Sequence, residues 1–165
     1  INSPLTSSCG RLFDAIAAIS GGRQEIRYEA QAAIEFMQAA QGQIGEDFTR
    51  FDILIDSDTH IVSVRHIIRE QVKRVQSGYD LPHLSQWFHH SLVETFTMVA
   101  EKLRIETGIN RVVLSGGVFQ NIILFNELLK SLSRRDFEVY THEQVPSNDG
   151  GLALGQIAIG QKFLV

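Results

Sequence analysis

A turn with two glycines in the second half of the chain carries residue types suited to hold a phosphate. Ser115, Gly116 and Gly117 follow a β-branched apolar run, and Asn121 stands before an apolar helical pattern. A strand, a tight turn and a helix N-terminus leave backbone N–H groups unpaired, and the helix dipole adds partial positive charge. Glycines also let a ligand approach the backbone closely. Asn121 would donate to a phosphate or ribose, or cap the helix, and a purely structural turn is the alternative for the segment.

Acidic side chains accompany this turn and a second one. Asp149 precedes another glycine pair, and its carboxylate offers the hard oxygen ligands that a divalent cation needs. A role as helix N-cap explains Asp149 equally well. Near the N-terminus, Asp14 and Glu29 flank the glycine pair that ends at Gly22, and two carboxylates suit the two hydroxyls of a ribose. Taken alone, these two acids are more simply solvated helix residues.

No arrangement typical of nucleophilic catalysis is evident from the spacing of the other reactive side chains. The single cysteine, Cys9, excludes an internal disulfide and fits a reducing compartment. For Cys9 a small buried side chain is favoured over a thiol activated at a helix start. His89 and His90 are adjacent, so on a helix they point about 100° apart and do not chelate one metal. We expect surface or partner-contact roles for the six histidines, and core positions for Trp87 and Phe88.

Composition narrows the class of protein. The 165 residues are 44% hydrophobic and 21% charged, which is typical of one globular domain. The formal net charge of −4 argues against a nucleic-acid surface. No apolar run approaches the ~20 residues that cross a membrane, and no signal-peptide pattern is present. We therefore expect a cytoplasmic protein with neither nucleic acid nor membrane as a partner.

Hydrophobic periodicity predicts the elements that must position the candidate residues. Helices are predicted for residues 11–19, 28–40, 65–76, 84–106, 120–132 and 150–161, with a loop at 78–82. Strands are predicted for 51–55 and 61–64, paired as a hairpin, and for 112–114 and 137–140. Alternation of helix and strand in the second half indicates a parallel pair with crossover helices. Both glycine turns then lie at the carboxyl edge of that sheet, where ligands bind.

Four segments in order resemble one enzyme family. They are TSSCGRLFDAIA at 6–17, YEAQAAIE at 28–35, LSGGVFQN at 114–121 and PSNDGGLALGQ at 146–156. Together they resemble the C-terminal part of the HypF carbamoyltransferases, which mature nickel–iron hydrogenases and are similar to the tRNA threonylcarbamoyl transferase. The resemblance implies an α/β fold, the second lobe of an actin/sugar-kinase/Hsp70-like (ribonuclease H-like) nucleotide-binding fold. It implies one domain, residues 1–165, with a small mixed sheet and crossover helices.

The resemblance also implies a chemistry. Carbamoyl phosphate and ATP yield a carbamoyl-adenylate in another domain, and the present domain passes the carbamoyl group to the C-terminal cysteine of a HypE-type acceptor protein. Asp149 would ligate a divalent metal. Asp14 and Glu29 would bind the ribose, and Gly22 would approach the adenine. The residues assigned to nucleotide binding are Asp14, Gly22, Glu29, Ser115, Gly116, Gly117 and Asn121.

One departure from the family pattern limits these expectations. The family's metal site also uses a His-x-x-x-His pair from the first lobe, and this sequence contains none. Because the chain also begins at Ile1 without an initiator methionine, we expect a piece of a longer protein that holds one side of a two-lobe cleft. We expect no carbamoyl transfer by this chain alone, and a homodimer formed through the exposed lobe-docking surface. A tRNA threonylcarbamoyl transferase or O-carbamoyltransferase of the same fold, and a non-catalytic interaction module, stay open as alternatives.

Overall fold

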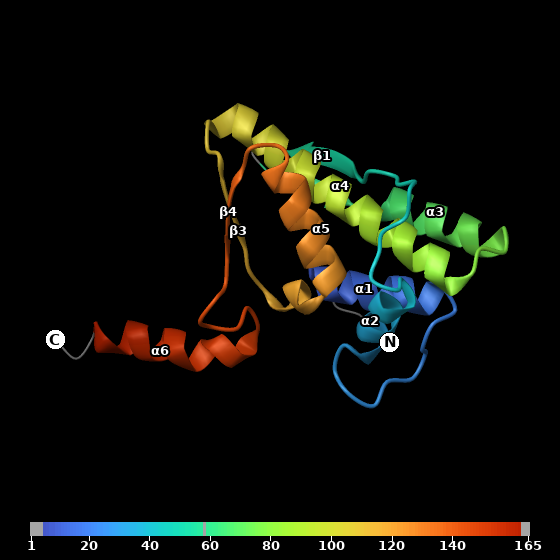
Figure 1. Cartoon of the computed structure of the whole chain (residues 1–165), viewed down its shortest axis with the longest axis horizontal. Coiled ribbons are helices and arrows are strands. Elements are labelled where there is room, and N and C mark those ends of the chain that lie inside the picture. The colour runs from blue at the N-terminus through green and yellow to red at the C-terminus, as the bar shows by residue number, and fades with distance from the viewer. Residues whose placement is uncertain (1–4, 58, 163–165) are drawn as a thin grey trace.

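One long helix, α4, lies at the centre of the computed structural model, which describes residues 5–57 and 59–162 (Figure 1). α2, α3 and α5 pack against α4, and α1 lies against α2 and α3. Two short 3-10 helices, η1 and η2, contain glycines of the turns after β3 (Arg111–Leu114) and β4 (Glu138–Thr141). The helices are α1 (Cys9–Ile19), α2 (Gln31–Ala39), α3 (Arg65–Gln76), α4 (Leu81–Thr107), η1 (Gly117–Gln120), α5 (Ile122–Ser133), η2 (Asp149–Gly151) and α6 (Leu152–Gln161).

Aromatic side chains of α4 form the middle of the core. Trp87 and Phe88 are both buried, which confirms the core positions predicted for them. The ring of Phe88 lies edge-on to Phe13 of α1, with centroids 5.1 Å apart, and 6.1 Å from Phe36 of α2. Such edge-to-face pairs add to the stabilisation that comes from burial alone. The first two helices are therefore held to α4 by aromatic packing.

Two helix starts differ from the sequence prediction by three residues, each for a local reason. The N-cap of α2, Ala30, has a left-handed φ of 60°, so the helix begins later than residue 28. α4 begins earlier than predicted, so Pro82 lies in its first turn and not in a loop. Proline is compatible with that position because the first amides of a helix have no intrahelical acceptor. Asp80 caps α4 by accepting a hydrogen bond from the amide of His83 at 3.0 Å.

Within the described residues, the strands form two separate two-stranded sheets. β1 and β2 form the predicted antiparallel hairpin, and β3 and β4 form the predicted parallel pair, with α5 as the crossover. The α/β class is thus confirmed, and its antiparallel and parallel parts lie in different sheets. The strands are β1 (Asp52–Asp56), β2 (Thr59–Ser63), β3 (Arg111–Leu114) and β4 (Glu138–Thr141).

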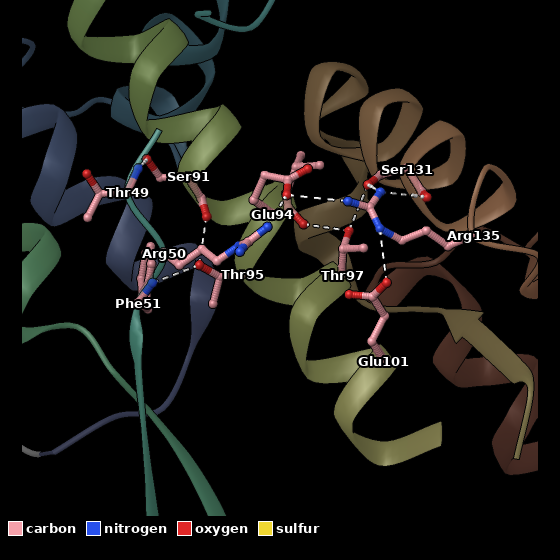
Figure 2. Close-up of polar contacts among 11 residues, drawn as sticks. Thr49, Arg50, Phe51, Ser91, Glu94, Thr95, Thr97, Glu101, Ser131 and Arg135 are labelled. Atoms are coloured by element: carbon pink, nitrogen blue, oxygen red, sulfur yellow. Dashed lines mark hydrogen bonds and ion pairs between the residues drawn. The ribbon is translucent and has the colours of Figure 1, made fainter. Parts of the chain in front are cut away.

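Hydroxyl groups of α4 hold the segment that leads into β1. Ser91 Oγ accepts a hydrogen bond from the amide of Thr49, and Thr95 Oγ1 accepts one from the amide of Phe51, each at 3.0 Å (Figure 2). Both hydroxyls lie on buried side chains. Backbone amides beside the core would be costly to leave unpaired, so these two bonds fix where the chain enters the hairpin.

Glu94 of α4 joins the same segment to α5. Its carboxylate lies 3.0 Å from the guanidinium of Arg50 and 3.5 Å from that of Arg135 (Figure 2). Arg135 also lies 3.2 Å from Glu101 and donates to Ser131 Oγ at 2.7 Å. Because the Glu94 side chain is only 13% exposed, solvent screens these pairs less than it screens pairs on an open surface. α4 is therefore the common support of β1 and α5.

The last helix, α6, carries apolar side chains that the rest of the described chain leaves open. It extends away from α4 and α5 in Figure 1, and Leu152, Leu154, Ile157 and Ile159 are each more than half exposed. An exposed apolar surface of this kind is typical of a contact region. The homodimer predicted from such a surface stays a prediction. Among the helices of the described residues, none has both the length and the hydrophobicity needed to span a bilayer.

Candidate functional site

The two predicted glycine turns meet at the carboxyl edge of the β3–β4 pair. Ser115, directly after β3, has its Oγ 2.8 Å from Nε2 of His142, directly after β4. A Cβ built on Gly117 would lie 3.9 Å from the Cβ of Asn148. Parallel strands joined by a crossover end at the same edge, and this brings the two turns together. The predicted shared edge is confirmed. The sequence did not indicate the contact between His142 and Ser115, because no motif joins the two residues.

The turn after β3 combines glycine geometry with free space. Gly116 has a φ of 108°, a conformation that L side chains rarely adopt. Gly117 lacks a positive φ, and a Cβ there would make only an ordinary contact. Gly117 also opens η1, and the first amides of a helix have no intrahelical acceptor. Packing therefore does not require a glycine at 117, and the position leaves room for a ligand near unpaired amides.

Asn121 caps α5 and contacts a buried histidine. Its Oδ1 accepts a hydrogen bond from the amide of Leu124 at 3.0 Å, which confirms the capping interpretation. Its Nδ2 lies 2.8 Å from Nε2 of His89. An amide group has two donor hydrogens and two acceptor lone pairs, so one of each remains for a ligand. Direct contact between Asn121 and a nucleotide stays a prediction.

The surface role expected for His89 is wrong, because its side chain is fully buried. Burial lowers the pKa of His89 to about 4, although hydrogen bonds with Ser85 and Asn121 oppose that shift. His89 is therefore neutral near pH 7. A signal was present in the sequence, since His89 precedes Leu92 by one helical turn on the apolar face of α4.

The two N-terminal acids lie in different surroundings. Asp14, on α1, forms an ion pair with Arg11 at 3.2 Å, and its Oδ1 is buried with no hydrogen-bond partner among the described residues. α1 packs against η1, so the helix that carries Asp14 lies beside the glycine turn that follows β3. Glu29 is exposed in the segment between α1 and α2. Their shared role at a ribose stays a prediction.

Gly22 is explained by packing alone. A Cβ at this position would lie 2.8 Å from the carbonyl oxygen of Ala17, which real Cβ atoms essentially never show. The amide of Gly22 donates to the same oxygen at 2.9 Å. The chain therefore needs a glycine to turn back onto the end of α1. The predicted approach of Gly22 to an adenine stays a prediction.

Asp149 is exposed at the start of η2, and it is not the residue that caps this helix. Asn148 is the cap, since its Oδ1 accepts a hydrogen bond from the amide of Gly150 at 3.0 Å. Within residues 5–57 and 59–162, no group of three or more His, Cys, Asp and Glu side chains is placed to hold a metal. One carboxylate does not form a metal site, so the metal role of Asp149 stays a prediction.

A small cavity lies beside this edge. It has a volume of about 250 Å³ and is lined by Leu114, Phe119 and Phe125 on one side and by residues 142–147 on the other. Sites for drug-sized ligands usually measure ~300–1,000 Å³, so this cavity takes only part of a nucleotide. One side of the cavity is apolar and aromatic, whereas the other side includes the polar residues Glu143, Gln144 and Ser147.

Cys9 is not an activated nucleophile. Burial raises the pKa of its thiol to about 11, so the reactive thiolate is scarce at neutral pH. The side chain is partly buried and packs against the core. This agrees with the structural role favoured for Cys9 from the sequence.

Comparison with known proteins shows that nearly the whole chain matches one protein family. The model of the family described as "Carbamoyltransferase, Kae1-like Domain, second subdomain" matches residues 1–156. Carbamoyltransferase HypF of Synechocystis sp. is 32% identical over 94% of this chain, which corresponds to 19% of that protein. Carbamoyltransferase HypF of Rhizobium leguminosarum bv. viciae is 33% identical over 99% of the chain and 21% of its own length.

A solved structure shows the same arrangement. The crystal structure of full-length HypF in the phosphate- and nucleotide-bound form superposes with a TM-score of 0.85 and 40% identity, over 96% of this chain and 21% of that one. The chain spans about a fifth of the length of the relatives it matches.

Proposed function

Because the chain belongs to the carbamoyltransferase family of Kae1-like second subdomains, we propose that it forms the nucleotide side of a carbamoyl-transfer site. The donor would be a carbamoyl-adenylate made from carbamoyl phosphate and ATP. The acceptor would be the C-terminal cysteine thiol of a HypE-type protein, in the maturation of nickel–iron hydrogenases. The observation that carries the proposal is the meeting of two turns at one sheet edge, with the Ser115 and His142 side chains 2.8 Å apart.

The residues of this edge would bind the adenylate phosphate. The amides of Gly116 and Gly117 supply donors, and the open space at Gly117 lets the phosphate come close to them. Ser115 offers a hydroxyl at the same turn. The adjoining α1 brings Asp14 toward the ribose, with Glu29 as the second acid. A similar solved structure is described as phosphate- and nucleotide-bound, which supports this assignment.

The transfer itself needs no nucleophile from this chain. The acceptor sulfur, as thiolate, attacks the carbonyl carbon of the carbamoyl group and forms a carbon–sulfur bond. The bond between that carbon and the phosphate oxygen breaks, and AMP leaves with the electron pair. The thiol proton passes to solvent. Amides fixed around the phosphate stabilise the charge that develops on the leaving group, and binding the nucleotide orients the carbonyl for attack. Cys9 would not carry the carbamoyl group, since its thiol is protonated at neutral pH.

A divalent cation would neutralise part of the phosphate charge. We propose Asp149 as one of its ligands, because an exposed carboxylate beside this edge supplies the oxygen that such ions prefer. The described residues would contribute only this ligand.

Calorimetric titration of the chain with AMP and with ATP tests the nucleotide role. We expect saturable binding, weakened about tenfold by Gly117→Ala, since a methyl group would displace one charge-assisted hydrogen bond. Gly155→Ala on α6 is the matched control, because a Cβ there meets nothing within 4 Å. Absence of binding by the unmodified chain would overturn the proposal and leave the non-catalytic interaction module.

A turnover assay tests the second part of the proposal. The chain is mixed with carbamoyl phosphate, ATP and a HypE-type acceptor, and the mass of the acceptor is measured by mass spectrometry. We expect no carbamoylated acceptor from this chain alone. Product formation would contradict the expectation that this chain holds only one side of the site.

A further inference from the structure

His89 is a buried titratable side chain that the transfer chemistry leaves unused. It lies in the middle of α4 with no solvent exposure. Its Nδ1 is 2.8 Å from the carbonyl oxygen of Ser85, one turn earlier in the helix, and its Nε2 is 2.8 Å from Nδ2 of Asn121. Both ring nitrogens are therefore engaged inside the protein. A polar group is costly to bury unless its partners are in place, so this position calls for a specific purpose.

The pattern of partners fixes the proton on the ring and the orientation of the amide. A carbonyl oxygen only accepts, so Nδ1 of His89 carries the hydrogen and donates it to Ser85. A neutral imidazole then presents a lone pair at Nε2, and Asn121 must donate to it through Nδ2. The carbonyl Oδ1 of Asn121 consequently faces the amide of Leu124, which it caps at 3.0 Å. A flipped amide would set a donor against the Leu124 amide and an acceptor against the lone pair of Nε2.

The same ring touches the two N-terminal helices. It stacks on Phe36 of α2 with centroids 6.0 Å apart and an interplanar angle of 24°. The ring of Phe13 on α1 lies 5.2 Å away at 54°. Phe13 immediately precedes Asp14, one of the acids proposed for the ribose. His89 thus contacts α1, α2 and the start of α5 at once.

We propose that His89 is a positioning residue for the nucleotide site: it orients the Asn121 amide and so holds the glycine turn between β3 and α5. This inference rests on the proposed function for its effect on nucleotide binding. The backbone links the two ends of the turn, since the amide of Asn121 donates to Val118 at 3.0 Å and the amide of Phe119 donates to Gly116 at 3.1 Å. If the Asn121 side chain rotates freely, η1 loses its fixed end and the amides of the turn lose their common direction.

Two substitutions at His89 separate positioning from packing. His89→Leu fills the space but leaves the Asn121 donor unpaired, and His89→Gln keeps an acceptor where Nε2 was. For His89→Leu we expect AMP to bind about tenfold more weakly, and the Leu124 amide to exchange about fivefold faster, as when a helix cap is lost. We expect His89→Gln to restore both within about threefold, the cost of imperfect hydrogen-bond geometry. Circular dichroism checks that both variants fold.

Asn121→Asp tests the contact without disturbing the core, because aspartate is an equally good N-cap. A carboxylate facing Nε2 requires a hydrogen on that nitrogen, so the ring must become an imidazolium. Nitrogen NMR of His89 should show a pyridine-type Nε2 and a protonated Nδ1 in the unmodified chain at pH 7. In Asn121→Asp both nitrogens should be protonated, with a raised pKa for His89.

The outcomes of the two proposals are distinguishable. If the unmodified chain binds neither AMP nor ATP, the proposed function fails, and Leu124 exchange together with the NMR signals of His89 still decides the positioning role. If Asn121→Asp leaves Nε2 unprotonated, the inference is overturned. It is also overturned if His89→Leu folds and keeps both AMP affinity and Leu124 protection. Should His89→Leu fail to fold, His89→Gln and Asn121→Asp carry the decision.

Discussion

Two of the chain's three glycine pairs, Gly21–Gly22 and Gly116–Gly117, look alike in sequence and differ in structure. In each pair the first glycine has a positive φ, 80° at Gly21 and 108° at Gly116, and the second does not. A Cβ on Gly22 would lie 2.8 Å from a backbone oxygen, whereas a Cβ on Gly117 would lie 3.9 Å from the nearest side-chain atom. The first pair is needed for the chain to fold back on α1. The second leaves space that the protein itself does not fill.

The two turns also differ in whether the chain itself satisfies their polar backbone groups. At the first turn, Gln24 donates through Nε2 to the carbonyl oxygens of Ala18 at 2.9 Å and Gly22 at 3.1 Å, so the chain satisfies its own acceptors. At the second, the opening amides of η1 have no intrahelical acceptor. A glycine pair is therefore informative about ligands only when its surroundings are known.

The largest expected effect is a difference between the two turns in how they respond to pH. The pKa of His89 is about 4 in the folded chain against an ordinary 6.5, so the unfolded chain takes up the proton first. Stability should fall as the pH drops from about 6.5 to about 4, by about 3 kcal/mol for a shift of this size. Amide exchange measured across that range should increase at Leu124 before it increases at Gly22. If exchange at the Leu124 and Gly22 amides increases at the same pH, the proposed difference between the two turns is wrong.

Gly22→Ala should have the largest effect among the glycine substitutions. The added methyl group meets a backbone oxygen that cannot move without unwinding α1, and overpacking of this kind costs about 1–3 kcal/mol. Urea denaturation of the variant measures the change in the free energy of unfolding. Gly155→Ala, on an open helical face, is the control and should not destabilise the chain. A neutral Gly22→Ala would show that packing does not explain this glycine.

Gly116→Ala should come next, with a loss of about 1–2 kcal/mol. Its Cβ meets nothing within 4 Å, so the cost comes only from forcing an L residue to a φ of 108°. The same denaturation series measures it. A loss greater than that of Gly22→Ala would mean that backbone strain outweighs direct overlap in this chain.

Gly117→Ala should change stability least, by under about 0.5 kcal/mol, because the methyl group finds an ordinary contact. Its effect should instead appear in AMP titration as weaker binding. Unchanged stability with unchanged AMP binding would show that the open space at this turn is not used by a nucleotide.

Local patterns were sufficient for most elements of the fold. Alternation in 51–55, an apolar β-branched run before Ser115 and similar strand-type patterns located the four strands of the described residues, and the order of helix and strand predicted the parallel pair and its shared edge. Boundaries were less accurate. Pro82 was placed in a loop because the capping hydrogen bond, which the His83 amide donates to Asp80, depends on side-chain geometry that spacing does not reveal.

Candidate site residues could be named from the sequence only where they formed motifs with their neighbours along the chain. Ser115, Gly116 and Asn121 belong to one such motif, and the structure places them in one turn beside the β3–β4 edge. His89 was assigned to the surface although it lies one helical turn before Leu92, and its partner Asn121, at the start of another helix, could not be found from spacing. His142 is exposed, as expected, but its contact with Ser115 was not predicted, because the two residues are far apart in the sequence.

The sequence by itself determined the class of fold, the family and the two turns, because each follows from periodicity or from motifs read along the chain. The tertiary structure alone decided which glycine is packed and which is open, and which histidine is buried. Both depend on atoms brought together from distant segments, as when Gly117 faces Asn148 or His89 faces Asn121. Sequence spacing describes neighbours along a helix or strand, whereas overlap and hydrogen bonding between elements arise only once the core has formed.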